Sequence, residues 1–203
     1  YKESKVERYL DLAKRAVVYL QSIAVGDESG TLIPYLDNPK TGPTWDKYYL
    51  STCHGPVGTT LVFRMLYELT GEQEYLDWIK RLARGIIRAG APEKNSWGYW
   101  ASNCQCCGAP GVLEHFVSVY ELTGEEEFLE YAKRTADVLV GDSQLLDGKR
   151  RWMSAWNRPT PEVVKSFTGF YVGSAGGSSS LLKPYSALEN KPFTDIFEYI
   201  YFD

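Results

Sequence analysis

Two short turns of the sequence carry side chains that could bind a soft metal ion. They read Cys53-His54-Gly55-Pro56-Val57-Gly58 and Cys106-Cys107-Gly108-Ala109-Pro110-Gly111. Thiolates and imidazoles are the side chains with which proteins commonly bind zinc. Each residue of the second turn lies 53 positions after its counterpart in the first, so three thiols and one imidazole fall at equivalent points of a repeat. This pattern predicts a metal site shared by the two turns.

Cys53, Cys106 and Cys107 are the predicted metal ligands. Each turn opens a predicted helix, whose free backbone amides and dipole stabilise a thiolate. Three protein ligands with an open fourth position are typical of catalytic zinc, and four are typical of structural zinc. Cys104 could supply a fourth thiolate, and that alternative stays open. Ordinary burial is the other alternative, since free cysteine is among the most buried residue types. Equivalent placement in two repeats favours the metal.

A helical hairpin is expected to follow each turn. The segment Tyr67-Glu68-Leu69-Thr70-Gly71-Glu72 recurs as Tyr120-Glu121-Leu122-Thr123-Gly124-Glu125 in the same register. In the first unit, the pattern predicts an apolar inner helix over about 58–69 and an amphipathic outer helix over about 72–89. A third turn, Gly173-Ser174-Ala175-Gly176, follows later in the chain. Repetition at this period indicates stacked or circularly arranged helical units.

The chain is predicted to form one domain over residues 1–203, with repeat units at about 53–105, 106–165 and 166–203. Its first predicted helix, around residues 9–16, matches an outer helix of the repeat, so the chain is expected to begin within a unit. No signal peptide is visible at the start. We expect the missing hairpins to be supplied by a longer protein or by another chain, because an uncovered apolar flank is normally covered.

Composition excludes several classes of function. With 44% apolar residues among 203, the chain can bury a sizeable core. A net charge of −4 with interspersed signs argues against a nucleic-acid partner, and no apolar stretch is long enough to predict a membrane span. Four cysteines are too few for a disulfide scaffold of this size. Free thiols indicate a reducing compartment, and a cytoplasmic location is expected.

These motifs resemble those of the lanthionine synthetase C-like family, which includes lanthipeptide cyclases and eukaryotic LanC-like proteins. The resemblance covers roughly residues 45–193. It rests on three motifs in order: Cys53-His54-Gly55-x-x-Gly58, Cys106-x-Gly108-x-x-Gly111 and Gly173-x-Ala175-Gly176. The segment Asn190-Lys191-Pro192-Phe193 also resembles the C-terminal signature of the family. The combination is more specific than any single Gly-x-x-Gly turn.

The resemblance implies an all-α fold, an α/α toroid of repeated helical hairpins. It also implies a zinc ion held by one cysteine of the first motif and a Cys-His pair of the second. On this sequence these positions are Cys53, Cys106 and Cys107. Cys107 departs from the common pattern, because many members have histidine there, but a thiolate is an acceptable zinc ligand. His54 falls where members have a tyrosine or histidine that lines the active site.

The reaction implied by the resemblance is the addition of a cysteine thiol to dehydroalanine or dehydrobutyrine, which gives a thioether. Eukaryotic relatives can use glutathione as the thiol, so a peptide or a thiol compound is the expected substrate. Zinc would lower the pKa of the thiol, and an acid would then protonate the enolate. His54 is the candidate catalytic acid, because histidine ordinarily titrates near neutral pH. Other catalytic residues of the family would lie upstream of Tyr1.

Two alternative functions remain open from the sequence. Aromatic residues gather ahead of the turns, and α/α toroids also host glycosidases and sugar epimerases, whose aromatic loops stack sugar rings. Such an enzyme needs two positioned carboxylates, and Asp46, Glu93, Asp147 and Glu162 lie in suitable loops. A zinc-stabilised module that binds a peptide without catalysis is the second alternative, with Cys104 as its fourth ligand. His115, the other histidine, is interpreted as a packed and hydrogen-bonded core residue.

Overall fold

The computed structural model describes residues 1–35, 48–94, 102–154 and 162–189. Over these ranges the fold is all-α with two short hairpins, which confirms the predicted class. The elements in chain order are α1 (Glu7–Ile23), β1 (Val25–Asp27), β2 (Gly30–Leu32), α2 (Pro56–Thr70), α3 (Gln73–Arg88), α4 (Ala109–Thr123), α5 (Glu126–Gly141), β3 (Gln144–Leu146), β4 (Lys149–Arg151) and α6 (Ser174–Leu188). Asp46, most of the predicted aromatic loop residues and the segment 190–193 lie outside the described ranges.

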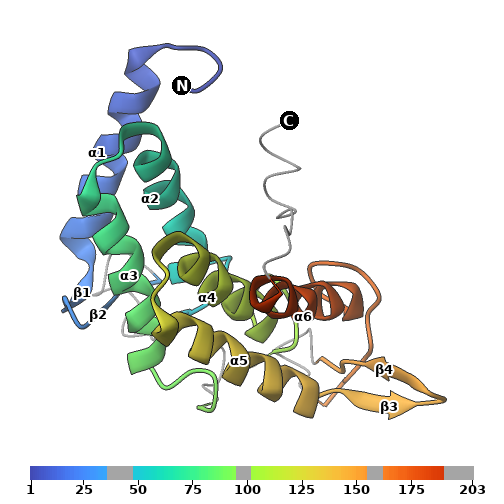
Figure 1. The fold of residues 1–203 in the computed structure, drawn as a ribbon. Coiled ribbons are helices and arrows are strands. Elements are labelled where there is room, and N and C mark those ends of the chain that lie inside the picture. The colour runs from blue at the N-terminus through green and yellow to red at the C-terminus, as the bar shows by residue number, and fades with distance from the viewer. Residues whose placement is uncertain (36–47, 95–101, 155–161, 190–203) are drawn as a thin grey trace.

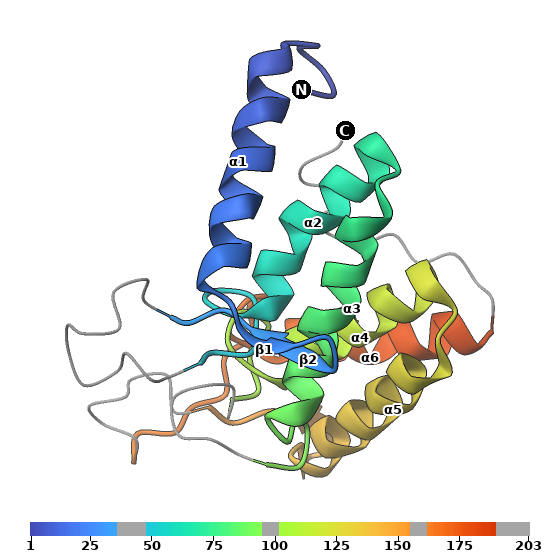
Figure 2. The same cartoon turned by 90° about the vertical axis from the view of Figure 1, so that its left-hand side faces the viewer.

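The helices form a sector of an α/α toroid. Inner helices α2, α4 and α6 follow one another, and outer helices α3 and α5 pack behind α2 and α4 (Figure 1). Helix α1 takes an outer position ahead of the α2–α3 hairpin and packs against α2 (Figure 2). The same ion pair recurs around the sector, between an outer helix and the turn that precedes the next outer helix. Lys14 of α1 lies 2.7 Å from Glu72, and Lys80 of α3 lies 3.5 Å from Glu125. The repeat in sequence is therefore a repeat in space.

Each hairpin is held together by an aromatic pair between its inner and outer helix. Phe63 of α2 stacks on Trp78 of α3 with ring centroids 5.6 Å apart. At the equivalent positions, Phe116 of α4 lies 5.7 Å from Tyr131 of α5. Both phenylalanines are completely buried. Helix α4 is buried on most sides, whereas α2 buries one face, so in both hairpins the aromatic pair marks the contact between the inner and the outer helix.

The helix boundaries follow from local chemistry. Pro56 and Pro110 stand in the first turns of α2 and α4, where proline costs no hydrogen bond. Gly71 and Gly124 end these helices with φ of 70° and 68°, the left-handed conformation that glycine adopts without a Cβ clash. The predicted inner and outer helices of the first unit agree with α2 and α3 to within a few residues.

The Gly-x-x-Gly turns are needed because a loop crosses each helix start at close range. A Cβ atom at Gly108 would overlap the carbonyl oxygen of Ser102, and one at Gly58 would overlap that of Thr52. The same overlap recurs at Gly176 of α6 with Phe170. The backbone at Gly108 is extended, with φ of −136°, so the requirement is steric and not conformational. The glycines therefore place the cysteine turns directly against the helix starts.

We expect Gly108→Ala to destabilise the protein by about 1–3 kcal/mol, the usual cost of forcing extra atoms into a packed interior. Urea denaturation with linear extrapolation measures this change. Gly141→Ala is the matched control, because nothing lies within 4 Å of its Cβ position in the last residue of α5. The control should leave the free energy of unfolding unchanged or raise it slightly. Equal effects of both substitutions would contradict the steric explanation.

The two β-hairpins are not predicted by the repeat pattern. They occupy equivalent places, one after α1 and the other after α5, with the same antiparallel register. Asp147 and Gly148 form the tight turn of the second hairpin with φ of 50° and 70°. Asp-Gly is a strong hairpin signal in a sequence, so this element could have been predicted. None of the helices in the described ranges is both long and apolar enough to cross a membrane.

Candidate metal centre

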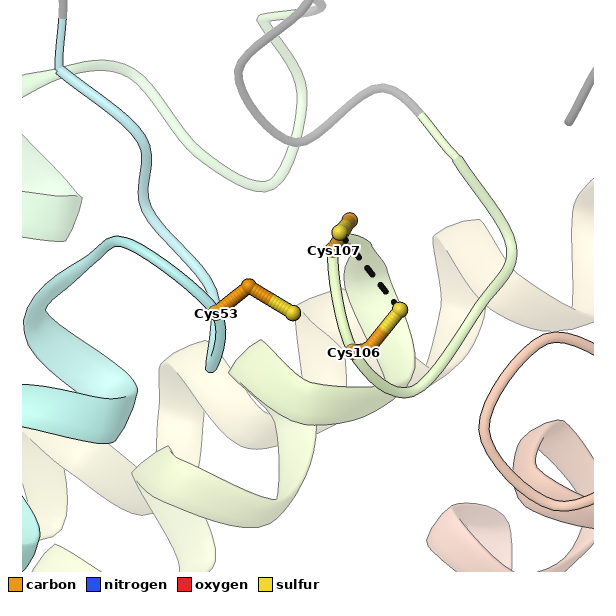
Figure 3. Close-up of side chains that lie close together, drawn as sticks. All are labelled: Cys53, Cys106 and Cys107. Atoms are coloured by element: carbon orange, nitrogen blue, oxygen red, sulfur yellow. Dashed lines mark hydrogen bonds between the residues drawn. The ribbon is translucent and has the colours of Figure 1, made fainter. Parts of the chain in front are cut away.

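Three cysteine sulfurs meet between two neighbouring turns. The Sγ atoms of Cys53, Cys106 and Cys107 all lie within 4.8 Å of one another. Cys53 precedes α2, and the other two precede α4, so the group joins two repeat units (Figure 3). Cys53 is exposed and the other two are half-buried. The group is therefore open to solvent on the side of Cys53.

Backbone hydrogen bonds hold the turns side by side. The amide of Cys53 donates to the carbonyl of Cys106 at 3.0 Å, and the amide of Cys106 donates to the carbonyl of Tyr171 at 3.2 Å. Tyr171 stands at the corresponding position of the third turn. Ser51 adds a side-chain bond, from its Oγ to the carbonyl of Gly108 at 3.2 Å. The cysteine positions are thus fixed by a ladder that runs from turn to turn, independently of any ligand.

The thiols beside α4 hydrogen-bond to one another. Sulfur distances are 3.4 Å from Cys106 to Cys107 and 3.7 Å from Cys104 to Cys106. Hydrogen bonds from Cys106 and then Cys107 lower the pKa of Cys104, and the same pairing with Cys104 raises the pKa values of Cys106 and Cys107. This pairing favours the thiolate form of Cys104 and the thiol forms of Cys106 and Cys107. Bound metal would require these ligands to be deprotonated.

Cys104 differs from the other cysteines in its surroundings. It is buried, and its sulfur lies 3.2 Å from the hydroxyl of Ser102. The close group of potential ligands in the described ranges consists of Cys53, Cys106 and Cys107. Cys104 therefore lies beside this group as a neighbour of Cys106.

The donor set is compatible with zinc. Tetrahedral coordination with Zn–S distances of about 2.3 Å places sulfurs roughly 3.8 Å apart. The observed sulfurs, 3.4 Å apart for Cys106 and Cys107 and within 4.8 Å for all three, need only side-chain adjustments to reach that spacing. Thiolate donors select soft or borderline metals such as zinc over magnesium and calcium. The three cysteines could hold a metal ion.

His54 lies next to the sulfur group in an aromatic setting. Its side chain is exposed, and its ring packs edge-on against Tyr35, with centroids 4.7 Å apart and planes at 82°. Tyr49 makes a second edge contact at 5.4 Å. Two tyrosines thus orient the imidazole of the residue that directly follows Cys53.

His115 is buried, as the sequence predicts, and its Nε2 atom has no hydrogen-bond partner among the described residues. Burial, and secondarily the charge of Arg64, lower the pKa of His115 to about 3, so the ring is neutral at pH 7. Sequence reasoning also missed a buried ion pair, between Lys183 of α6 and Glu114 of α4 at 3.0 Å. Comparison of the inner helices position by position would have found these polar residues.

Three loop residues in the described ranges, Trp152, Glu93 and Asp147, have structural roles. Trp152 is buried, and its indole N–H donates to the carbonyl of Leu139 at 2.7 Å. Glu93 pairs with Arg134 at 2.7 Å. Asp147 forms the turn of the second hairpin. Trp152 thus packs in the loop layer over the end of α5.

Comparison with protein families gives a match over nearly the whole chain. The model described as lanthionine synthetase C-like protein matches residues 1–198. No match was found among curated proteins. The match extends the resemblance beyond the motif region to the N-terminal helix.

Proposed function

Because this chain belongs to the lanthionine synthetase C-like family, we propose that it adds a thiol to a dehydroalanine or dehydrobutyrine residue to form a thioether. The observation that carries this proposal is the convergence of three cysteine sulfurs from two repeat units within 4.8 Å. Ordinary core cysteines have no reason to gather at equivalent turns. The substrate would be a dehydrated peptide together with a thiol, either in the same peptide or in a separate compound.

Cys53, Cys106 and Cys107 would hold zinc. When bound, zinc supplies a Lewis acid that lowers the pKa of the substrate thiol and makes thiolate available at neutral pH. Three protein ligands are the number found at zinc sites that also accept a substrate. The ladder of hydrogen bonds from Cys53 to Cys106 to Tyr171 keeps the ligand turns in place before the ion binds.

His54 would move the proton that the addition requires. Attack of sulfur on the β-carbon forms the C–S bond and places the electron pair of the double bond on the α-carbon as an enolate. A ring nitrogen of His54 would take the proton released by the thiol and return it to the α-carbon, so the reaction balances. Edge contacts from Tyr35 and Tyr49 limit rotation of the imidazole. The exposed ring lies where a peptide could reach it.

We expect His54→Phe to lower the rate of thiol addition by about 10²–10⁴-fold, the usual contribution of a general acid. His54→Tyr has the same ring size as His54→Phe but keeps an O–H donor, so it should retain more activity. Mass spectrometry of a dehydroalanine peptide incubated with a thiol gives both rates. Zinc content should be equal in the two variants. A rate for His54→Phe equal to that of the unsubstituted chain would exclude a proton-transfer role of His54.

X-ray absorption at the zinc edge, combined with the thiol-addition assay, tests the proposal as a whole. We expect three sulfurs and one lighter atom around zinc, together with thioether formation. Four sulfurs without activity would instead support a peptide-binding module closed by Cys104. A protein that binds no zinc, or that adds no thiol when loaded with zinc, would contradict the proposed reaction.

A further inference from the structure

Cys104 is a buried thiol that the proposed reaction does not use. The residue is only 2% exposed. Its sulfur lies 3.2 Å from the hydroxyl oxygen of Ser102 and 3.7 Å from the sulfur of Cys106. Cys106 is one of the three candidate metal ligands. A fourth thiol therefore touches a ligand sulfur while standing outside the ligand group.

The repeat shows that the turn does not need a thiol at this position. In the 53-residue register Cys104 corresponds to Ser51, and in the third turn it corresponds to Gly169. Ser51 is also 2% exposed, and its hydroxyl donates to the carbonyl of Gly108. Other residue types thus occupy the same place in the same kind of turn, so packing alone does not require a sulfur atom here.

Backbone hydrogen bonds fix the turn that carries these thiols. The amide of Gly108 donates to the carbonyl of Cys104 at 2.8 Å, and the amide of Cys106 donates to the carbonyl of Tyr171 at 3.2 Å. The backbone therefore holds Cys104 and Cys106 at close range. A disulfide bond is about 2.05 Å long. Rotation about the Cα–Cβ bonds can supply the remaining approach of the two sulfurs from 3.7 Å.

Cys107 is a poorer disulfide partner for Cys106, although their sulfurs lie 3.4 Å apart. The Cα atoms of adjacent residues are about 3.8 Å apart across a trans peptide. Disulfides usually join Cα atoms about 4.4–6.8 Å apart, so a disulfide between neighbours is strained. Cys104 is separated from Cys106 by Gln105 and is free of this limit.

We propose that Cys106 is an oxidation site with Cys104 as its resolving thiol, and that a hydroperoxide converts the two into a disulfide. The sulfur of Cys106 attacks the peroxide, which forms an S–O bond, breaks the O–O bond and releases water or an alcohol. The sulfur of Cys104 then attacks the Cys106 sulfur, which forms the S–S bond and displaces the oxygen as water. In total the two thiols lose two electrons and two protons, and the peroxide is reduced.

The burial of the two cysteines assigns these roles. Cys106 is half-buried, so a small peroxide can reach it, whereas Cys104 is buried and acts through Cys106. The disulfide would remove Cys106 from the candidate ligands and leave Cys53 and Cys107. A small thiol would reopen the bond by exchange. The site would therefore bind metal when thiols are abundant and lose it in the presence of peroxide, a regulation that rests on the proposed function.

Disulfide mapping tests this proposal on the zinc-free chain. The reduced chain is treated with one equivalent of hydrogen peroxide, and free thiols are blocked with one alkylating reagent. Disulfides are then reduced and labelled with a second reagent. Fragment masses should place the second label on Cys104 and Cys106. Trypsin separates Cys53 from these residues, because Arg64 lies between them. A second label on Cys53 or Cys107, or none at all, would overturn the proposal.

Cys104→Ser is the matched variant, because it introduces the residue type of the equivalent Ser51. It removes the resolving thiol and leaves the candidate ligands in place. Peroxide should then form a disulfide at Cys106 more slowly by about tenfold or more, because the neighbouring thiol that captures the oxidised sulfur is missing. Disulfide formation at the rate of the unsubstituted chain would overturn the role of Cys104.

Zinc release tests the regulation separately from thiol addition. In the zinc-loaded chain the same peroxide treatment should transfer the metal to a chromophoric chelator, and a thiol reductant should restore binding. A chain that forms the disulfide and keeps its zinc would overturn the regulation. A chain that forms the disulfide but adds no thiol when reduced would contradict the proposed reaction alone. A chain that adds the thiol but forms no disulfide would contradict the oxidation site alone.

Discussion

Replacing Cys106 with serine is expected to abolish stoichiometric zinc binding and thiol addition together. Cys106 lies at the centre of the sulfur group, 3.4 Å from Cys107 and hydrogen-bonded through its backbone to Cys53. Serine at this position keeps the backbone hydrogen bonds. Its hydroxyl, however, does not deprotonate at neutral pH and does not provide a soft sulfur donor. Outer-shell partners of metal ligands are already worth roughly 10–100-fold in affinity, so loss of a ligand should exceed about 100-fold. Competition with a chromophoric chelator measures the change.

Cys104→Ser is the matched control for this substitution. Cys104 lies 3.7 Å from the Cys106 sulfur, but it is buried and bonded to Ser102. If zinc is held by three cysteines, this variant should bind zinc with nearly unchanged affinity and should remain active. Loss of zinc from Cys104→Ser with retention in Cys106→Ser would exclude the proposed ligand set.

The sequence predicts this site to an unusual extent because the repeat supplies its three-dimensional register. Cys53 and Cys106 fall at equivalent points, and equivalent turns of a helical repeat lie side by side. The observed bond between their backbones is what that register requires. The role of Gly108 could also be predicted from the sequence, because a glycine beside the start of a helix signals the close approach of another backbone segment.

Contacts between residues at non-equivalent positions of the repeat could not be predicted from the sequence. The partner of Lys183 is Glu114, but the third turn follows the second after 65 residues instead of 53, and the two residues do not stand at equivalent positions of their helices. The orphan Nε2 atom of His115 depends on the space left between two helices, which no pattern of residue types specifies. Packing decides such details, and a sequence pattern records only which face of a helix is apolar.

The inner helices are linked laterally by polar groups as well as by the turns. The hydroxyl of Ser180 on α6 can donate to Gln105, at 2.8 Å, or to Glu114, at 3.0 Å. Gln105 directly precedes Cys106, so the buried ion pair and the cysteine turn belong to one network. Loss of the ion pair is therefore expected to change the metal affinity of the cysteine turn.

Lys183→Met is expected to be the most destabilising of the substitutions considered for the helices. It leaves the carboxylate of Glu114 buried, with its side chain only 7% exposed, and deprived of its cation at 3.0 Å. Removing one partner of a buried pair typically costs about 3–5 kcal/mol. Urea denaturation of the zinc-free chain measures the loss. A free energy of unfolding equal to that of the unsubstituted chain would show that the pair is not coupled.

The double variant Glu114→Gln with Lys183→Met separates the charge from the packing. Both side chains remain long enough to fill the interface, and no net charge is buried, so most of the stability should return. The amide introduced by Glu114→Gln can still accept a hydrogen bond from Ser180, which keeps Gln105 in place beside the cysteine turn. Zinc affinity should therefore fall in Lys183→Met and recover in the double variant. Recovery of stability without recovery of zinc affinity would show that the network does not position Cys106.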